Sequence, residues 1–120
     1  FGAVAAVTRV PAGIVRSVPE SRALLEKAMN EVAAVARARG VRLRSEAVGG
    51  ALAQVDALLP DATASMQRDI QAGRPSELQD QVGAIVRMAR ERRVEVPANE
   101  FLLAALLPQE LKARTAASNG

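Results

Sequence analysis

The stretch that most constrains the fold of this chain is 64–99, in which two segments with helical spacing of apolar residues flank a Gly-Arg-Pro break at 73–75. Glycine readily adopts the left-handed turn that ends a helix, and proline suits the first turn of the next one. We therefore expect two helices joined by a tight turn, the second running from 76 to about 92. A short extended piece, residues 94–96, then leads to a proline.

Similar apolar periodicity, interrupted by proline and glycine, continues through the rest of the chain. No segment alternates apolar and polar residues long enough for a strand, so we predict an all-α multi-helix bundle in which residues 1–120 form a single domain. The remaining helices are expected over 1–10, 17–40, 45–59, 61–72 and 98–107. Pro11 and Gly13 end the first of these helices, Ser17 to Glu20 form a capping box for the second, and Ser45 and Asp61 cap the third and fourth. Gly49 and Gly50 mark close packing or a kink, and Pro108 stops the last helix, with a further turn or two to Arg114 and a frayed tail at 115–120.

The chain contains no histidine and no cysteine. Disulfides, thiolate nucleophiles, serine–histidine pairs and ordinary zinc sites are therefore excluded. The acidic residues show no cluster with the spacing of a cation site, so we expect no metal. Because Phe1 and Phe101 are the only aromatic residues, the core must consist mainly of small aliphatic side chains.

The net charge of +3 comes from arginine, which gathers at 37–44 and 87–93. These clusters are either solvated faces that complement the negative ends of helices or surfaces that bind phosphate groups. Because stacking aromatics are missing, we expect no nucleic-acid partner. No apolar run is long enough to span a membrane and no signal peptide is visible, so we expect a cytoplasmic protein. The rival function class is a helical interaction module whose basic surface binds an acidic partner or nucleic acid.

Polar residues at fixed spacing distinguish the stretch 64–99 from an ordinary helix pair. The series consists of Ser65-Met66, Asp69, Gly73-Arg74, Glu77, Gly83, Pro97 and Asn99. It resembles the C-terminal helical domain of ketopantoate reductases (2-dehydropantoate 2-reductases), whose fold is similar to that of 6-phosphogluconate dehydrogenase-like proteins.

The resemblance implies that this chain is the C-terminal domain of an NADPH-dependent oxidoreductase. The enzyme would reduce 2-dehydropantoate to pantoate in pantothenate and coenzyme A biosynthesis. Alternatively, it would be a close relative of such reductases that acts on another 2-oxo acid or ketone. The resemblance also implies a nucleotide-binding domain and a general-acid lysine upstream of Phe1. This chain has no dinucleotide-binding fingerprint of its own. NADP would then bind mainly to that other domain, and this chain alone would be inactive. Formation of a homodimer is left as an open possibility.

Ser65 and Glu77 are the site candidates that the resemblance supplies. In the family, the matching serine hydrogen-bonds the carboxylate end of the substrate, and the matching glutamate contacts the nicotinamide cofactor through ribose hydroxyls. Each residue has a structural alternative: a helical serine that bonds a backbone carbonyl, and an acidic residue that complements a helix dipole. Asp69 is expected to stabilise local structure, and Arg74 to shape the turn or to pair with Glu77. No catalytic residue is expected within this chain.

Four positions depart from the family pattern. The family often has aspartate and asparagine where this chain has Gln79 and Val82, and it can have substrate-binding asparagines where this chain has Gly2 and Ala12. These departures weaken the expectation that 2-dehydropantoate itself is the substrate and leave open a relative that acts on another 2-oxo acid or ketone.

Overall fold

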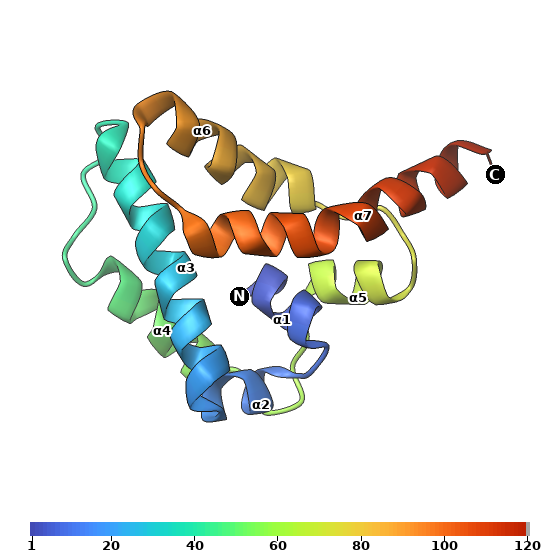
Figure 1. Ribbon diagram of the computed structural model, residues 1–120. Coiled ribbons are helices and arrows are strands. Elements are labelled where there is room, and N and C mark those ends of the chain that lie inside the picture. The colour runs from blue at the N-terminus through green and yellow to red at the C-terminus, as the bar shows by residue number, and fades with distance from the viewer. Residues whose placement is uncertain (120) are drawn as a thin grey trace.

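The computed structural model describes residues 1–119, in which the regular elements are helices and none is a strand. The all-α prediction is therefore confirmed. In Figure 1, α7 crosses the middle of the molecule with α6 on one side and α1 and α5 on the other, while α3 crosses near its N-terminal end. No helix of this described part is long and apolar enough to cross a membrane. The elements are α1 (Gly2–Thr8), α2 (Ala12–Ser17), α3 (Pro19–Ala38), α4 (Ala47–Ala57), α5 (Ser65–Gln71), the π-helical turn η1 (Gln79–Gly83), α6 (Ala84–Arg92) and α7 (Pro97–Asn119).

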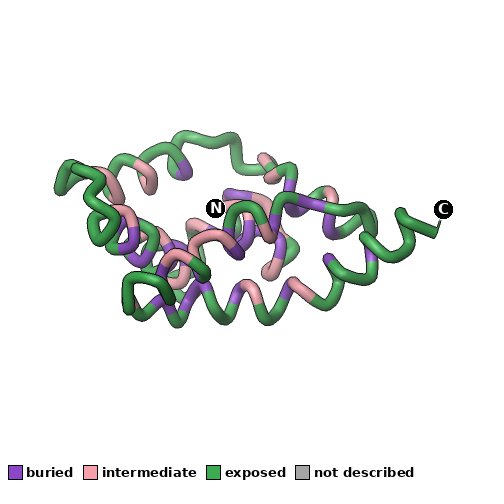
Figure 2. The backbone as a smooth tube through the Cα atoms, turned by 90° about the horizontal axis from the view of Figure 1, so that it is seen from above, coloured by how far each residue is buried: buried purple, intermediate pink, exposed green. Residues whose placement is uncertain are grey.

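Helix α1 lies at the centre of the bundle because it is apolar and small on every side. Four successive residues, Ala3, Val4, Ala5 and Ala6, are buried, and α1 packs against α2, α3, α5 and α7. A helix that is apolar all round is expected to be enclosed by its neighbours. Figure 2 shows buried positions gathered around this helix and exposed positions along the outer sides of the surrounding helices.

The stretch 64–99 folds as predicted into two helices around a tight turn. Helix α5 ends shortly before Gly73, which takes the left-handed conformation with φ 70°. The second helix begins as η1 and continues without a break as α6, and residues 94–96 lie outside regular secondary structure. The π-turn was not predicted. Such turns are rare and are frequently found at functional sites.

Helix α2, which the sequence did not predict, is held by the backbone of the segment before α5. The N–H groups of Ala12 and Gly13 donate to the carbonyl oxygens of Ala62 and Pro60, at 2.9 Å each. A Cβ on Gly13 would lie 2.9 Å from the Pro60 oxygen, so only glycine permits this approach. Arg16 adds to the junction by donating to three carbonyl oxygens at the C-terminal end of α4, where a cation is favourable.

The N-terminal end of α7 is capped by a carboxylate from α3. Glu31 is buried and accepts hydrogen bonds from the backbone N–H groups of Ala98 and Asn99 and from the Asn99 side chain, each at 2.9 Å. The first N–H groups of a helix have no partner within the helix and need an outside acceptor when they are buried. Glu31 therefore fixes α3 against α7.

The caps predicted at Ser17, Ser45 and Asp61 are wrong, because none of these residues caps a helix. Ser17 belongs to α2, and its hydroxyl donates to the Ile14 carbonyl oxygen. Ser45 donates to the adjacent Glu46, and Asp61 lies in a turn well before α5 begins. Short polar side chains readily make such local hydrogen bonds, which compete with capping.

Two further boundaries differ from the sequence prediction. Helix α1 ends at Thr8 and not at Pro11, because Arg9 adopts the left-handed conformation with φ 62°. In α4, a Cβ on Gly49 or Gly50 would meet nothing within 4 Å, so these glycines do not mark close packing.

Pro108 does not stop the last helix, which runs through it to Asn119. An internal proline removes one backbone hydrogen bond and crowds the preceding turn. The part beyond it is nevertheless held in place, because Glu110 and Ala113 are both buried against the rest of the bundle. Residues 115–119, expected to fray, are helical, and Gly120 lies outside the described residues.

Candidate functional site

Ser65 is the first residue of α5 and is exposed. Its neighbours are held in place by Gln67, whose side chain accepts a hydrogen bond from Ala64 N–H and donates to the Val10 carbonyl oxygen at 3.0 Å. The Ser65 hydroxyl itself makes no hydrogen bond within residues 1–119, so it does not bond a backbone carbonyl as its structural alternative requires. The hydroxyl is therefore available to a molecule in solvent.

Glu77 lies in the turn before η1 and is also exposed. Its Oε2 accepts a hydrogen bond from the Gln81 side chain at 2.7 Å, and its carbonyl oxygen accepts one from Gln81 N–H at 2.9 Å. The other carboxylate oxygen has no partner within the described residues 1–119. Gln81 thus orients the Glu77 side chain through one carboxylate oxygen, and the other oxygen is free to accept a hydrogen bond.

Arg74 pairs with Asp69 and not with Glu77. Its guanidinium lies 3.1 and 3.2 Å from Asp69 Oδ1, and its backbone N–H donates to the Asp69 carbonyl oxygen at 2.8 Å. The pair closes the turn around Gly73. Both residues therefore act on local structure, as the sequence indicated for Asp69.

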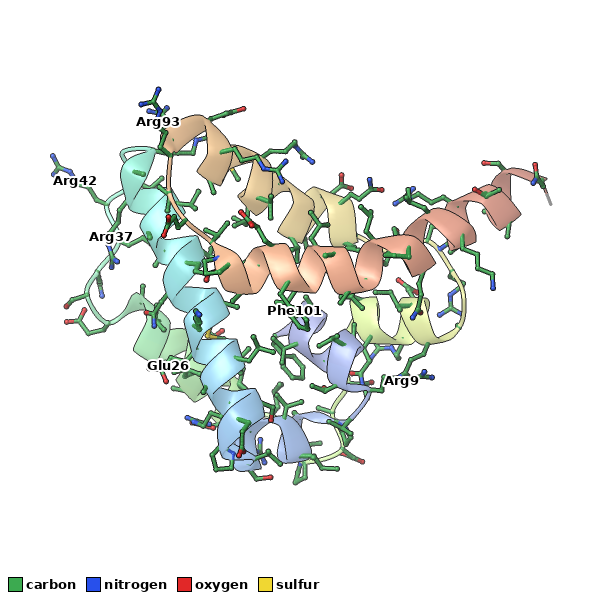
Figure 3. All side chains as sticks on the ribbon, viewed as in Figure 1. Arg9, Glu26, Arg37, Arg42, Arg93 and Phe101 are labelled. Atoms are coloured by element: carbon green, nitrogen blue, oxygen red, sulfur yellow. The ribbon has the colours of Figure 1, made fainter. Side chains whose placement is uncertain are left out.

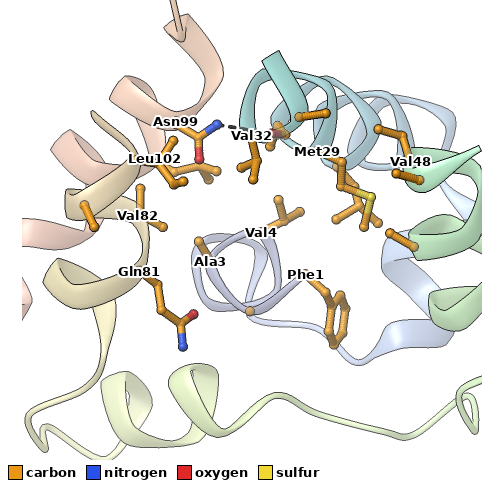
Figure 4. Close-up of a pocket in the computed structure, with 18 of the residues that line it drawn as sticks. Phe1, Ala3, Val4, Met29, Val32, Val48, Gln81, Val82, Asn99 and Leu102 are labelled. Carbon is orange, nitrogen blue, oxygen red and sulfur yellow. Dashed lines mark hydrogen bonds between the residues drawn. The ribbon is translucent and has the colours of Figure 1, made fainter. Parts of the chain in front are cut away.

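A cavity of about 510 Å³ surrounds the N-terminal end of α1. Its walls come from α3, α4 and the η1–α6 unit and are mostly aliphatic, with Asp80, Gln81 and Asn99 as the polar lining residues. Figure 4 shows Phe1 and Gln81 on either side of α1.

Neither Ser65 nor Glu77 lines this cavity, but each lies one contact away from it. Gly2 lines the cavity, and a Cβ on Gly2 would lie 3.8 Å from Ala64 Cβ, next to Ser65. Gln81 lines it as well and holds Glu77. The starts of α5 and of η1 therefore both lie next to residues that line the cavity.

Asn99 is a cavity residue to which the sequence gave no role. Its amide nitrogen donates to the Ala28 carbonyl oxygen and to Glu31 Oε1, both of which only accept hydrogen bonds. These partners fix the direction of the amide, and its oxygen points toward the cavity in Figure 4. The Pro97–Asn99 motif in the sequence could have pointed to Asn99. Its hydrogen bond with Glu31 could not have been predicted, because Glu31 is distant in sequence and belongs to no recognisable pattern.

The departures from the family pattern lie in different places. Val82 and Gly2 line the cavity and make its wall apolar, whereas Gln79 is half-buried in η1 and Ala12 is buried at the start of α2. Within residues 1–119, no group of three or more acidic side chains is placed to hold a metal ion.

The two arginine clusters adjoin at the other end of the η1–α6 unit, where α3 packs against α6. Arg39 contacts Met88 between the two helices. None of the clustered arginines pairs with a carboxylate within residues 1–119. Figure 3 shows three of them, Arg37, Arg42 and Arg93, at this end. We name the cluster the arginine end; it comprises Arg37, Arg39, Arg42, Arg44, Arg87, Arg90, Arg92 and Arg93.

Comparison with known proteins relates nearly the whole chain to one family. Residues 1–110 match the family described as "Ketopantoate reductase PanE/ApbA C terminal". The chain is 34% identical over 97 residues to a 2-dehydropantoate 2-reductase of Halobacterium salinarum, covering 81% of this chain and 32% of that protein. It is 32% identical over 105 residues to one of Caulobacter vibrioides, covering 88% and 36%. The chain spans about a third of the length of these curated relatives.

Solved structures show the same fold. A PanE/ApbA family ketopantoate reductase from Ralstonia eutropha superposes with a TM-score of 0.83 at 32% identity, over 95% of this chain and 38% of that one. A dimeric ketopantoate reductase from Staphylococcus aureus superposes with a TM-score of 0.88 at 23% identity, over 93% and 39%.

Proposed function

We propose a function from one premise: this chain belongs to the ketopantoate reductase PanE/ApbA C-terminal family. On that premise it forms the substrate-side domain of an NADPH-dependent oxidoreductase. The full protein reduces 2-dehydropantoate to pantoate or reduces another 2-oxo acid or ketone. The observation that carries the proposal is the family match over residues 1–110, which includes Ser65, Glu77 and the turn between them.

The rest of the enzyme is a nucleotide-binding domain that precedes this chain and supplies both the cofactor site and the general-acid lysine. The length of the matched relatives leaves room for such a domain, since this chain spans only about a third of them. The active site then lies between the two domains, on the side where the starts of α5 and η1 lie next to the cavity. We further propose a cytoplasmic enzyme and, by analogy with the dimeric Staphylococcus aureus protein, a homodimer.

Ser65 binds the carboxylate of the substrate. Its hydroxyl is exposed and has no partner within residues 1–119, so it is free to donate a charge-assisted hydrogen bond to an anion. Such a bond would hold the 2-oxo acid in one orientation, and NADPH, when bound, would supply the hydride.

Glu77 binds the cofactor. Gln81 holds one oxygen of its carboxylate, and the other oxygen is free to accept a hydrogen bond from a ribose hydroxyl. The residues present therefore fit the part of NADPH that the resemblance assigns to them.

If the substrate is another 2-oxo acid or ketone, the cavity favours one with an apolar group where the family's usual substrate makes polar contacts. Val82 and Gly2 leave the cavity wall without the amide side chains expected at those positions. An apolar wall favours an apolar substituent, because burial of its surface contributes roughly 25 cal/mol per Å².

The test is turnover by the full-length protein. Consumption of NADPH is measured with 2-dehydropantoate and with a series of 2-oxo acids that differ in the size of the apolar substituent. We expect turnover with at least one of them, a higher kcat/KM for the apolar members, and no turnover by this chain alone. Absence of turnover with every 2-oxo acid and ketone tested would contradict the proposal.

A further inference from the structure

We infer that Glu110 is a positioning residue for Glu77. The inference rests on the cofactor role proposed above for Glu77. Glu110 lies on α7 beyond Pro108, and its side chain is 0% exposed. It acts through Ser76, the residue immediately before Glu77, and its contacts leave the backbone at that point little freedom.

The Glu110 carboxylate binds Ser76 in three ways. Its two oxygens accept hydrogen bonds from the Ser76 backbone N–H at 2.7 and 3.0 Å, and Oε2 also accepts one from the Ser76 hydroxyl at 3.0 Å. Arg114, one turn further along α7, completes the cluster. It lies 3.2 Å from Glu110 Oε1 and donates to the Ser76 carbonyl oxygen at 2.8 Å.

These contacts fix the two peptide planes that flank Ser76. The Ser76 N–H belongs to the plane before it, and the Ser76 carbonyl belongs to the plane that contains the Glu77 nitrogen. With both planes bound to side chains of α7, the Glu77 Cα has a defined position. The Ser76 hydroxyl also accepts a hydrogen bond from Leu78 N–H at 3.2 Å, which orients the start of the following helix.

The Glu77 side chain is fixed separately from its backbone. Gln81, which is part of η1, donates to Glu77 Oε2 at 2.7 Å. Glu110 and Arg114 therefore fix the position of the Glu77 Cα, and Gln81 fixes the position of the Glu77 carboxylate. A carboxylate that must meet a ribose hydroxyl at hydrogen-bond distance needs both.

Stability alone does not explain a buried carboxylate at this position. Removing a carboxylate from water is costly, and apolar residues of similar volume often serve the stability of a core equally well. Apolar contacts have no direction, whereas the hydrogen bonds of Glu110 hold specific backbone atoms. The choice of a carboxylate is explained by the need to hold Ser76 in one orientation.

The experiment uses the full-length protein and the variants Glu110→Ala, Glu110→Gln and Glu77→Ala. The measured quantities are the KM for NADPH, the kcat at saturating NADPH and the melting temperature. We expect Glu110→Ala to raise the KM for NADPH about 10-fold, equivalent to the loss of one good hydrogen bond, while kcat stays within about twofold. Glu110→Gln keeps one acceptor oxygen for the Ser76 N–H and should recover most of the loss; it also serves if the alanine variant does not fold.

Two comparisons separate positioning from a merely structural role. Val35→Ala, in the distant contact between α3 and α6, lowers the melting temperature without touching this region and should leave the KM for NADPH unchanged. In a Glu77→Ala background, Glu110→Ala should add less than about twofold to the KM, because a residue that acts through Glu77 has nothing left to position.

The outcomes distinguish this inference from the proposed function. If Glu77→Ala raises the KM for NADPH but neither Glu110 variant does, the positioning role is overturned and the proposed function stands. If Glu110→Ala raises the KM equally with and without Glu77, Glu110 acts by another route and the inference is overturned. If Glu77→Ala leaves the KM unchanged, the cofactor role of Glu77 fails and the inference fails with it.

Discussion

The two ends of the η1–α6 unit are held in different ways. At its start, Glu110 and Arg114 bind the backbone of Ser76 through hydrogen bonds of 2.7 to 3.0 Å. At its end, a small apolar cluster of Val35, Val86, Ala89 and Val96 attaches the helix to α3 and to the chain before α7. The cations of the arginine end are exposed and have no carboxylate partner within residues 1–119.

The difference shows what each kind of contact can specify. Hydrogen bonds fix the direction of individual backbone groups, whereas apolar contacts fix only that two surfaces stay together. The start of the unit is therefore suited to present a side chain to a small molecule. At its other end, the arginines are exposed and none pairs with a carboxylate within residues 1–119, so no ion pair fixes a side chain there for presentation to a small molecule.

Among the variants that test the difference between the two ends, Ser65→Ala in the full-length protein is expected to have the largest effect, a loss of kcat/KM. The change removes one donor to a charged substrate group, worth roughly 1.5–3 kcal/mol, so kcat/KM should fall about 10- to 150-fold. The melting temperature should not change, because Ser65 is exposed. Steady-state kinetics and a thermal melt measure both quantities.

Ser45→Ala is the matched control for this variant, since it removes an exposed hydroxyl next to the arginine end. It should keep wild-type kinetics. An equal loss of kcat/KM in both variants would mean that the effect of Ser65 is not specific to the site.

A second effect is expected at the opposite end. Val35 is 1% exposed, and Val35→Ala should lower the free energy of unfolding by about 2 kcal/mol through the cavity that it leaves. Denaturant unfolding measures this change, and kcat and KM should stay at wild-type values. A loss of activity parallel to the loss of stability would show that the two ends are coupled.

Glu77→Ala should act on the cofactor complex. We expect the KM for NADPH to rise about 10-fold through the loss of one hydrogen bond. The structural alternative, in which Glu77 only complements the helix dipole, predicts a stability loss of about 0.3–1 kcal/mol and unchanged kinetics. Kinetics and a thermal melt on the same preparation decide between them.

The smallest effect is expected at the arginine end itself. Arg90→Gln combined with Arg92→Gln should change the free energy of unfolding by less than about 0.5 kcal/mol, because both side chains are exposed and unpaired. Binding of the wild-type chain to duplex DNA should be weak and lost at physiological salt. Tight, sequence-dependent binding at that salt would support the rival interaction module.

The sequence was sufficient where the signals were local. Periodicity located the body of the main helices, and the Gly73–Pro75 break located the turn that the structure shows. It failed where a distant partner decided the outcome. Helix α2 depends on carbonyl oxygens of Pro60 and Ala62, and the continuation of α7 through Pro108 depends on contacts that Glu110 makes far away in sequence.

The candidate site could be predicted only in part for the same reason. Ser65 and Glu77 belong to a recognisable series, and the structure leaves both exposed. The residues around them gave no such signal, because Gln81 looks like any exposed helical glutamine and Glu110 like any helical acid. Their roles depend on a π-turn and on a helix crossing that no local pattern encodes.

The π-turn η1 also makes the length of this segment matter as much as its composition. A π-turn contains one residue more than the α-helical turn that it replaces, and it accommodates this residue within the turn. Removal of a single residue there would restore a regular α-helix and leave the parts on either side facing nearly the same way. Insertion of a residue between η1 and α6 without a second π-turn would instead rotate everything before it by about 100° around the helix axis relative to α6. Glu77 would then face another direction, although every side chain named in the site would still be present, and a comparison of residue identities alone would miss that difference.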